Sequence, residues 1–180
     1  DGINGIKLGP EYPGSTYLEF QQEILSLYHR GVILALCSKN NELDIWDVMD
    51  NNSQMLIKRE HISSAMINWE DKASNIQKIA RDLNIGLDSL VFIDDSSFEV
   101  NFIRQQLPGV TVLQVPEKLY EYPTMLRENI GLFYNLSFTD EDRKKIDMYK
   151  HQIKREMIKE EFTDIEDYLA SLELKITIYE

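Results

Sequence analysis

Polar side chains stand at the ends of three apolar or strand-like segments of the sequence. The segment Cys37-Ser38-Lys39-Asn40 overlaps the end of the run VILALC, Asp94 and Asp95 follow LVFI, and a polar loop over 68–72 leads to a helical pattern. In open parallel sheets, ligands bind beyond the carboxyl ends of the strands. If these segments are parallel strands, their hydroxyl, ammonium and carboxylate groups therefore lie around one binding site.

Asp94 and Asp95 are adjacent carboxylates directly after an apolar strand pattern. They would repel each other at neutral pH unless a divalent cation lay between them. Mg²⁺ takes oxygen ligands and is usually held by one or two carboxylates together with a substrate phosphate. The alternative is that they cap and begin the helix expected near Ser97, where the helix dipole favours negative charge. The residues alone leave both interpretations open.

Ser38 and Lys72 would suit a phosphate ligand. The Ser38 hydroxyl can donate to a phosphoryl oxygen, with Lys39 and Asn40 contributing to phosphate and substrate binding at the entry to the next helix. Lys72 can balance the charge of a phosphorylated or acyl-phosphate intermediate. Taken singly, Ser38 also fits a turn residue and Lys72 a solvated surface lysine. Cys37, in an apolar run, also fits a buried core thiol.

The elements that would position these residues alternate between strand and helix. Continuous apolar runs of strand length are typical of strands buried on both faces of a parallel sheet. Right-handed crossovers between such strands give an α/β fold, a three-layer αβα sandwich around a Rossmann-like parallel sheet. The patterns predict helices over 17–29, 40–49, 71–83 and 98–106, and strands over 32–37, 63–67, 90–93 and 110–115.

The last part of the sequence differs in character. The stretch 140–160 is rich in charged residues with interspersed apolar ones, which predicts a long amphipathic helix. A shorter helix over 164–171 and a strand-like segment over 174–179 follow. We therefore expect an α/β domain over 1–136 and a helical linker over 137–180 that leads into a further domain.

Composition excludes several classes of function. The chain of 180 residues carries a net charge of −12, which disfavours binding to nucleic acid or anionic lipid. It has no apolar stretch of about 18 residues, so no membrane span is expected. The single cysteine, Cys37, rules out a disulfide within the chain and indicates a reducing, cytoplasmic location.

The order of the motifs resembles that of the haloacid-dehalogenase (HAD) superfamily: a strand ending in serine, then a lysine, then a strand ending in Asp-Asp. At closer range the chain resembles the FkbH-like family over nearly its whole length. The resemblance rests on the strings IKLGPEYPG, LEFQQEILSLYHRGVILALCSKNNE, INWEDKASNI, LNIGLDSLVFIDD, FIRQQLPGV, DRKKIDMYKHQ and DIEDYLASLELKITI.

The resemblance implies a magnesium-dependent glyceryltransferase/phosphatase of polyketide biosynthesis. Such a protein would remove phosphate from 1,3-bisphosphoglycerate and load the glyceryl group onto the phosphopantetheine arm of an acyl carrier protein. Ser38 would be the second HAD motif, Lys72 the third, and Asp94 with Asp95 the magnesium ligands of the fourth. Cys37 would be the acyl-accepting thiol, since a thioester conserves acyl-transfer potential.

The sequence departs from the superfamily in its first motif, DxDxT, which is absent. In HAD folds the strand with this motif lies between the strands that would carry Ser38 and Asp94. Without it the sheet would have a gap of about 9.5 Å, or two inter-strand spacings. We therefore expect the sequence to be part of a longer protein, with an acetyltransferase-like domain after the linker. The first motif either precedes Asp1 or has been lost, and its loss would leave the chain inactive.

Two other functions remain open at this stage. One is a small-molecule phosphatase of the same fold, in which Cys37 would take no part in the chemistry. The other is a non-catalytic docking domain of a large synthase, which would be consistent with the missing first motif.

Overall fold

The computed structural model describes residues 7–133 together with Met148. Residues 7–133 form an α/β unit in which helices alternate with parallel strands, and this confirms the predicted fold class. The predicted helices and strand of the C-terminal segment, and the boundary expected at 136, lie outside the described residues, apart from helical Met148. No helix in the described part is both long enough and apolar enough to span a bilayer.

The elements follow the predicted order. Each predicted strand occurs within two residues of its expected ends, and the first helix begins three residues earlier than predicted. The elements are α1 (Gly14–His29), β1 (Leu34–Ser38), α2 (Glu42–Asn51), β2 (Ile62–Ile67), α3 (Lys72–Asp82), β3 (Val91–Asp94), α4 (Ser97–Gln106), β4 (Thr111–Gln114) and α5 (Tyr122–Glu128). Short 3₁₀ turns lie at Arg59–His61, Leu87–Ser89, Leu119–Glu121 and Ile130–Phe133.

Local signals in the sequence set the ends of the helices next to the strands. α1 ends in a Schellman motif, in which Gly31 N–H donates to Tyr28 O and Val32 N–H to Leu27 O. Gly31 has a φ of 95°, a conformation that glycine adopts without the steric cost of a Cβ atom. At the N-terminus of α3, the Asp71 carboxylate caps the helix by accepting a hydrogen bond from Ser74 N–H at 2.8 Å.

The strands form two parallel pairs. β1 pairs with β2, and β3 pairs with β4, and within residues 7–133 no backbone ladder joins one pair to the other. This differs from a single continuous sheet. The interruption lies between the pair that carries Ser38 and the pair that carries Asp94, which is where the sequence predicted that a strand is missing.

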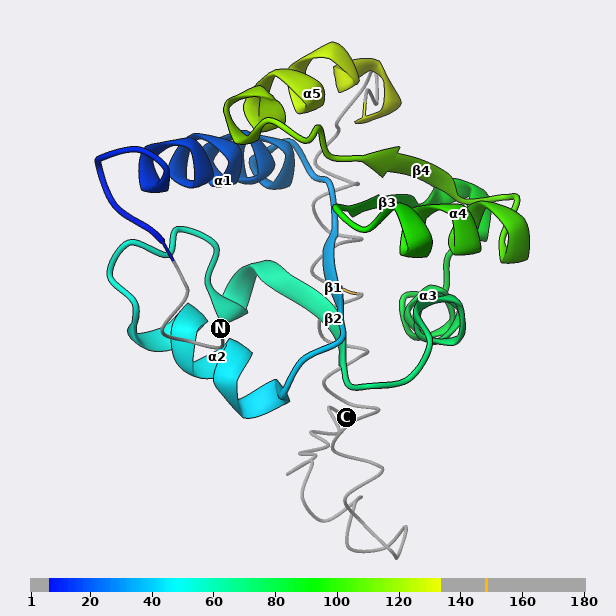
Figure 1. Ribbon diagram of the computed structural model, residues 1–180. Helices are drawn as coiled ribbons and strands as arrows, with labels where there is room; N and C mark the ends of the chain where they lie inside the picture. Colours follow the sequence, from blue (N-terminus) through cyan, green and yellow to red (C-terminus); the bar gives the residue numbers. More distant parts are fainter. Residues whose placement is uncertain (1–6, 134–147, 149–180) are drawn as a thin grey trace, which may run out of the picture.

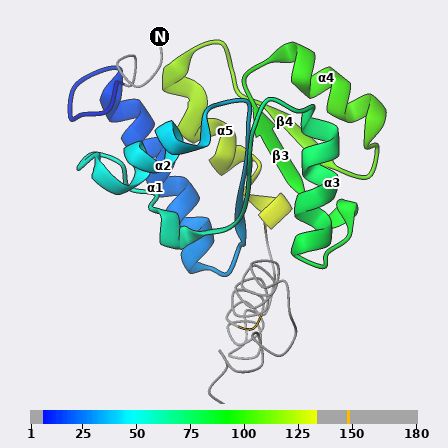
Figure 2. The ribbon, with the colours of Figure 1, turned by 90° about the horizontal axis from the view of Figure 1, so that it is seen from below.

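The helices lie on two sides of the strands. Figure 2 shows α1 and α2 on one side of the strands and α3 and α4 on the other, in agreement with the predicted three layers. α3 packs on β1 and β2, whereas α4 packs on β3 and β4. Because α3 also contacts α4, this helical layer joins the two strand pairs.

The main core lies beneath α3 and α4. It combines side chains from both helices with side chains from and next to the β3–β4 pair, and the partly buried Cys37 of β1 packs against it. Burial of these apolar groups stabilises the packing of the two helices on the strands. The cluster consists of Ala73, Ile76, Phe92, Ile103, Leu107 and Val110.

α5 was not predicted from the sequence. It begins at Tyr122 with Pro123 in its first turn, a position that proline favours because its missing N–H would have no helical partner there. α5 packs against α1, and Arg127 forms ion pairs of 2.5 Å with Glu19 and 2.7 Å with Glu23. Only seven residues long, this helix has too short a periodic pattern to be recognised without its tertiary partner.

We predict that Ile103→Ala lowers the free energy of unfolding by about 2–4 kcal/mol, because a fully buried side chain leaves a cavity when it is truncated. Ile103 is 0% exposed, whereas Leu43 is 83% exposed. Urea denaturation followed by circular dichroism measures the change, with Leu43→Ala as the control that shifts stability by less than about 0.5 kcal/mol. Equal effects of the two substitutions would contradict the assigned core.

Candidate functional site

The carboxyl ends of the two strand pairs meet at one edge of the fold. Ser38 is the last residue of β1 and Asp94 the last residue of β3, while Lys72 begins α3 after the loop that follows β2. Two ion pairs connect this edge across the interruption, from Lys72 to Asp94 and from Lys39 to Glu99. The structure therefore joins Lys72 to Asp94 and places Ser38, at the end of β1, at the same edge.

Lys72 and Asp94 form the inner contact. The Lys72 ammonium donates to Asp94 Oδ2, and their side chains are only 13% and 6% exposed. The other oxygen, Oδ1, accepts from Ser96 N–H at 2.9 Å. Lys72 is therefore not a solvated surface lysine. Removing either partner would leave a buried charge uncompensated, which typically costs about 3–5 kcal/mol.

Asp94 and Asp95 do not cap α4. Ser96 is the N-cap, and its hydroxyl accepts from Glu99 N–H at 3.4 Å. Asp95 is exposed and makes no hydrogen bond or ion pair within residues 7–133. Burial, followed by the nearby Tyr17 and Asp95, raises the pKa of Tyr122 on α5, which places Asp95 near that helix. Asp94 thus contacts Lys72, whereas the side chain of Asp95 is exposed.

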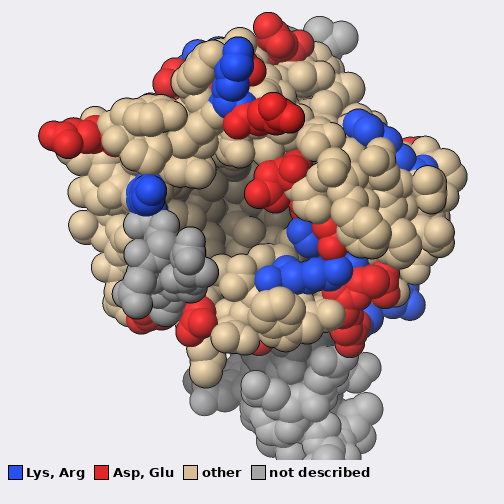
Figure 3. Space-filling view, in the orientation of Figure 1, with Lys and Arg blue, Asp and Glu red and all other residues tan. Residues whose placement is uncertain are grey.

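Ser38 lines a cavity of 690 Å³. Its hydroxyl accepts a 3.4 Å hydrogen bond from the side chain of Asn40, which is itself exposed. The remaining walls are mostly apolar and come from α1, β1 and α2, with Tyr17, Phe20, Leu36, Ile45 and Val48 among them. Figure 3 shows the surface hollowed between these elements, with acidic and basic side chains along one border.

Cys37 faces away from this cavity. Because alternate residues of a strand point to opposite faces, Cys37 packs against the core beneath α3, and its Sγ lies 3.8 Å from Lys72 O. Burial raises the pKa of the Cys37 thiol to about 11, although Lys72 opposes the shift. The acyl-accepting role of Cys37 remains a prediction, and this environment favours the unreactive thiol over the nucleophilic thiolate.

Glu99 is a site residue that sequence analysis missed. It lies in the first turn of α4, and its Oε1 accepts from Lys39 Nζ at 2.7 Å. This hydrogen bond is the main reason why the pKa of Lys39 is raised. Glu99 Oε2 is buried and has no hydrogen-bond partner among the described residues. The signal available in the sequence was the spacing of a third acid five residues after Asp94 in the string DDSSFE.

The available oxygen atoms suit a hard cation such as Mg²⁺ only in part. Asp94 and Asp95 offer carboxylates at the strand end, and Glu99 Oε2 is an acceptor without a partner. Within the described residues, however, no group of three or more His, Cys, Asp or Glu side chains is arranged to hold a metal ion. A Mg²⁺ ion here would therefore take one or two protein carboxylates and complete its shell with water and substrate oxygens, as it commonly does.

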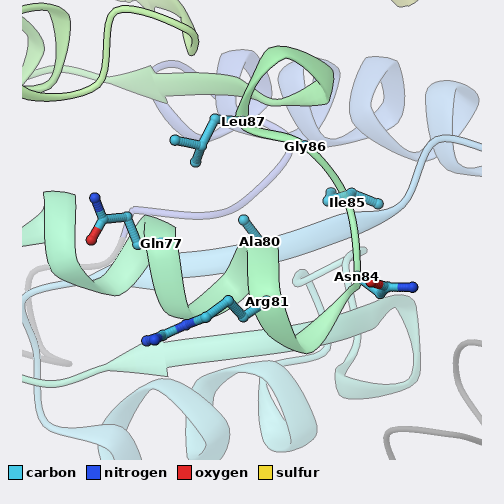
Figure 4. Close-up of a pocket in the computed structure, with 7 residues that line it drawn as sticks. All are labelled: Gln77, Ala80, Arg81, Asn84, Ile85, Gly86 and Leu87. Carbon is cyan, nitrogen blue, oxygen red and sulfur yellow. The ribbon is translucent and has the colours of Figure 1, made fainter.

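A second cavity, of 630 Å³, lies at the other edge of the strands. Figure 4 shows it at the end of α3 and the following turn, before β3 begins. Its lining combines the polar side chains of Gln77, Arg81 and Asn84 with apolar groups, and it contains no carboxylate or nucleophile. It is therefore separate from the chemistry at the carboxyl ends of the strands.

Comparison with solved structures finds a similar fold. The N-terminal part of the protein BF1531 from Bacteroides fragilis, which contains a phosphatase domain complexed with Mg, matches with a TM-score of 0.72 and 42% sequence identity. The match covers 77% of this chain and 37% of that chain, so this chain spans little more than a third of the other's length. No protein-family model matches the chain, and no curated protein matches it.

We predict that native Cys37 reacts slowly with iodoacetamide and that its rate rises about tenfold per pH unit from pH 7 to 10, because only the thiolate reacts. With a pKa of about 11, the thiolate fraction at pH 8 is about one in a thousand. Mass spectrometry of the labelled chain measures the rate. In urea the rate should instead level off near pH 9, the ordinary value for this thiol. A native rate that levels off near pH 8 would contradict the buried position.

Proposed function

We propose that the chain is the α/β part of a magnesium-dependent HAD-type enzyme that acts on phosphate esters or acyl phosphates. The observation that carries the proposal is the buried contact of Lys72 with Asp94 across the two strand pairs, at the edge where Ser38 ends β1. The Mg-bound phosphatase domain of the similar Bacteroides fragilis protein supports it.

Each residue has a chemical part in this proposal. The Ser38 hydroxyl donates to a phosphoryl oxygen, and the Lys72 ammonium stabilises negative charge that builds up as the phosphoryl group is transferred. Asp94, with Asp95, would hold the metal ion. When bound, Mg²⁺ would neutralise phosphate charge and orient the phosphoryl oxygens, which together with positioning supplies most of the catalysis in such reactions.

The nucleophile of the reaction is not among the described residues. We propose that in the full-length protein an aspartate-bearing strand lies between the β1–β2 and β3–β4 pairs. The absence of a backbone ladder between these pairs in residues 7–133 supports this arrangement. The aspartate oxygen would bond to phosphorus as the substrate oxygen leaves with its electron pair, and water would then release phosphate.

The finer proposal is glyceryl transfer from 1,3-bisphosphoglycerate to an acyl carrier protein in polyketide biosynthesis. It rests on the resemblance to the FkbH-like family. An overall charge of −12 disfavours an acidic carrier protein, so a docking surface must be locally apolar or basic. The exposed side chains of Leu43, Trp69 and Phe98 follow β1, β2 and β3 respectively and offer an apolar rim around the site.

A plain small-molecule phosphatase is the second candidate. The observation that favours it is the position of the partly buried Cys37, which packs against core side chains away from the Ser38 cavity and whose raised pKa keeps the thiol protonated. Such an enzyme would release phosphate and leave no acyl group on a carrier protein.

We predict that Asp94→Asn in the full-length protein lowers magnesium-dependent phosphate release by about a hundredfold or more, because it removes a metal ligand and the charge partner of Lys72. Phosphate release from a phosphate monoester, with and without EDTA, is the measurement. Asp82→Asn, at an exposed position at the end of α3, is the matched control. Thermal unfolding of each variant separates loss of activity from loss of fold. Unchanged activity in a folded Asp94→Asn protein would reject the proposed site.

We predict that Trp69→Ala reduces loading of a radiolabelled glyceryl group onto carrier protein about tenfold, while phosphate release from small substrates stays within twofold. The physical reason is that exposed aromatic side chains commonly supply the binding energy of protein interfaces. Leu132→Ala, at an exposed site on the last 3₁₀ turn, is the control. Phosphate release by the wild type without any loading would favour the plain phosphatase.

A further inference from the structure

The Lys39–Glu99 ion pair has features of a built recognition element. It joins the residue after β1 to the first turn of α4, residues 60 positions apart in the chain. The Glu99 side chain is 9% exposed, whereas that of Lys39 is 35% exposed. The carboxylate is thus fixed inside the fold, and the ammonium that it holds faces outward at the mouth of the site.

The two lysines at this edge differ in depth. Lys72 is only 13% exposed and contacts Asp94 at the centre of the proposed phosphate site. Lys39 follows Ser38 in the chain and is nearer to solvent. Asp94 and Asp71 both act on its charge, so it belongs to the same electrostatic cluster. The site therefore presents an inner cation and an outer cation to one ligand.

The contact with Glu99 leaves Lys39 able to bind a further group. Only Oε1 of the carboxylate accepts from it, and an ammonium group has three donors. Two N–H groups of Lys39 therefore remain for other acceptors. A buried carboxylate that uses one oxygen on a lysine and leaves the other unpartnered is costly as a purely structural element. This cost is consistent with a role in positioning the lysine.

We propose that Lys39 is a specificity-determining residue that recognises a second anionic group on the phosphorylated substrate, with Glu99 as its positioning residue. This inference rests on the proposed function and assigns a residue to the far end of its substrate, a small phosphorylated molecule that carries a carboxylate or a second phosphate. The phosphoryl group that reacts lies at Ser38 and Lys72, and the second anionic group lies at Lys39.

The test compares two phosphate monoesters that differ in one group. 3-Phosphoglycerate carries a carboxylate where glycerol 3-phosphate carries a hydroxymethyl group. Magnesium-dependent phosphate release by the full-length protein gives kcat and KM for each. We expect the wild type to favour 3-phosphoglycerate about tenfold or more in kcat/KM, through a lower KM, since a contact to a remote group contributes uniform binding. The preference should shrink as ionic strength rises.

Substitutions then assign the preference to the ion pair. Lys39→Gln should abolish this preference by raising KM for 3-phosphoglycerate about tenfold more than it raises KM for glycerol 3-phosphate, and Lys39→Arg should keep part of the preference. Glu99→Gln should weaken the preference for 3-phosphoglycerate. The double variant should lose no more of that preference than Lys39→Gln alone, because the two residues act as a unit. Lys78→Gln, which breaks the exposed ion pair of Lys78 with Glu70, is the matched control and should leave the preference unchanged.

The outcomes separate this inference from the proposed function. Equal use of both substrates by an active wild type, or an equal loss for both in Lys39→Gln, would overturn the role of Lys39 and leave the proposed function standing. No magnesium-dependent turnover of either substrate would count against the proposed function. In that case calorimetric binding of 3-phosphoglycerate decides the inference, which requires binding about tenfold weaker in Lys39→Gln and is overturned by equal affinity.

Discussion

The buried contact between Lys72 and Asp94 is the interaction on which the arrangement of this edge depends. No backbone ladder joins the two strand pairs in the described residues, so their carboxyl ends are connected by side chains. An apolar core can hold two layers together, but it is non-directional and does not fix individual atoms. A charged hydrogen bond between two nearly buried groups is directional and does fix them.

The surroundings of each side chain at this edge decide which chemistry it can perform. Ser38 and Cys37 are adjacent in the chain, yet one lines an open cavity and the other packs into the core. Burial raises the pKa of the thiol even though Lys72 lies close by, so desolvation outweighs the nearby positive charge. The hydroxyl, which needs no ionisation to donate a hydrogen bond, remains available at the cavity.

The order of elements could be predicted because β1 to β4 are short apolar runs with helical stripes between them, and both patterns are local. Two features of the structure could not be predicted from the sequence. α5 is held by Arg127 and the aromatic contacts of Tyr122 with Tyr17 and Phe20, all of which cross to a distant helix. Glu99 is acidic in the first turn of a helix, which is an ordinary position until the tertiary structure pairs it with Lys39.

The α/β class, the positions of the strands and the polar residues at their ends follow from local sequence, because they depend on side-chain periodicity and on turn and cap residues a few positions apart. Tertiary structure decided which of these residues act together. It joined Lys72 to Asp94, left Asp95 exposed, packed Cys37 against the core and brought Glu99 to Lys39. These contacts depend on which face of a strand each side chain occupies and on how helices that are distant in sequence pack together. The spacing of residues along the chain does not specify either.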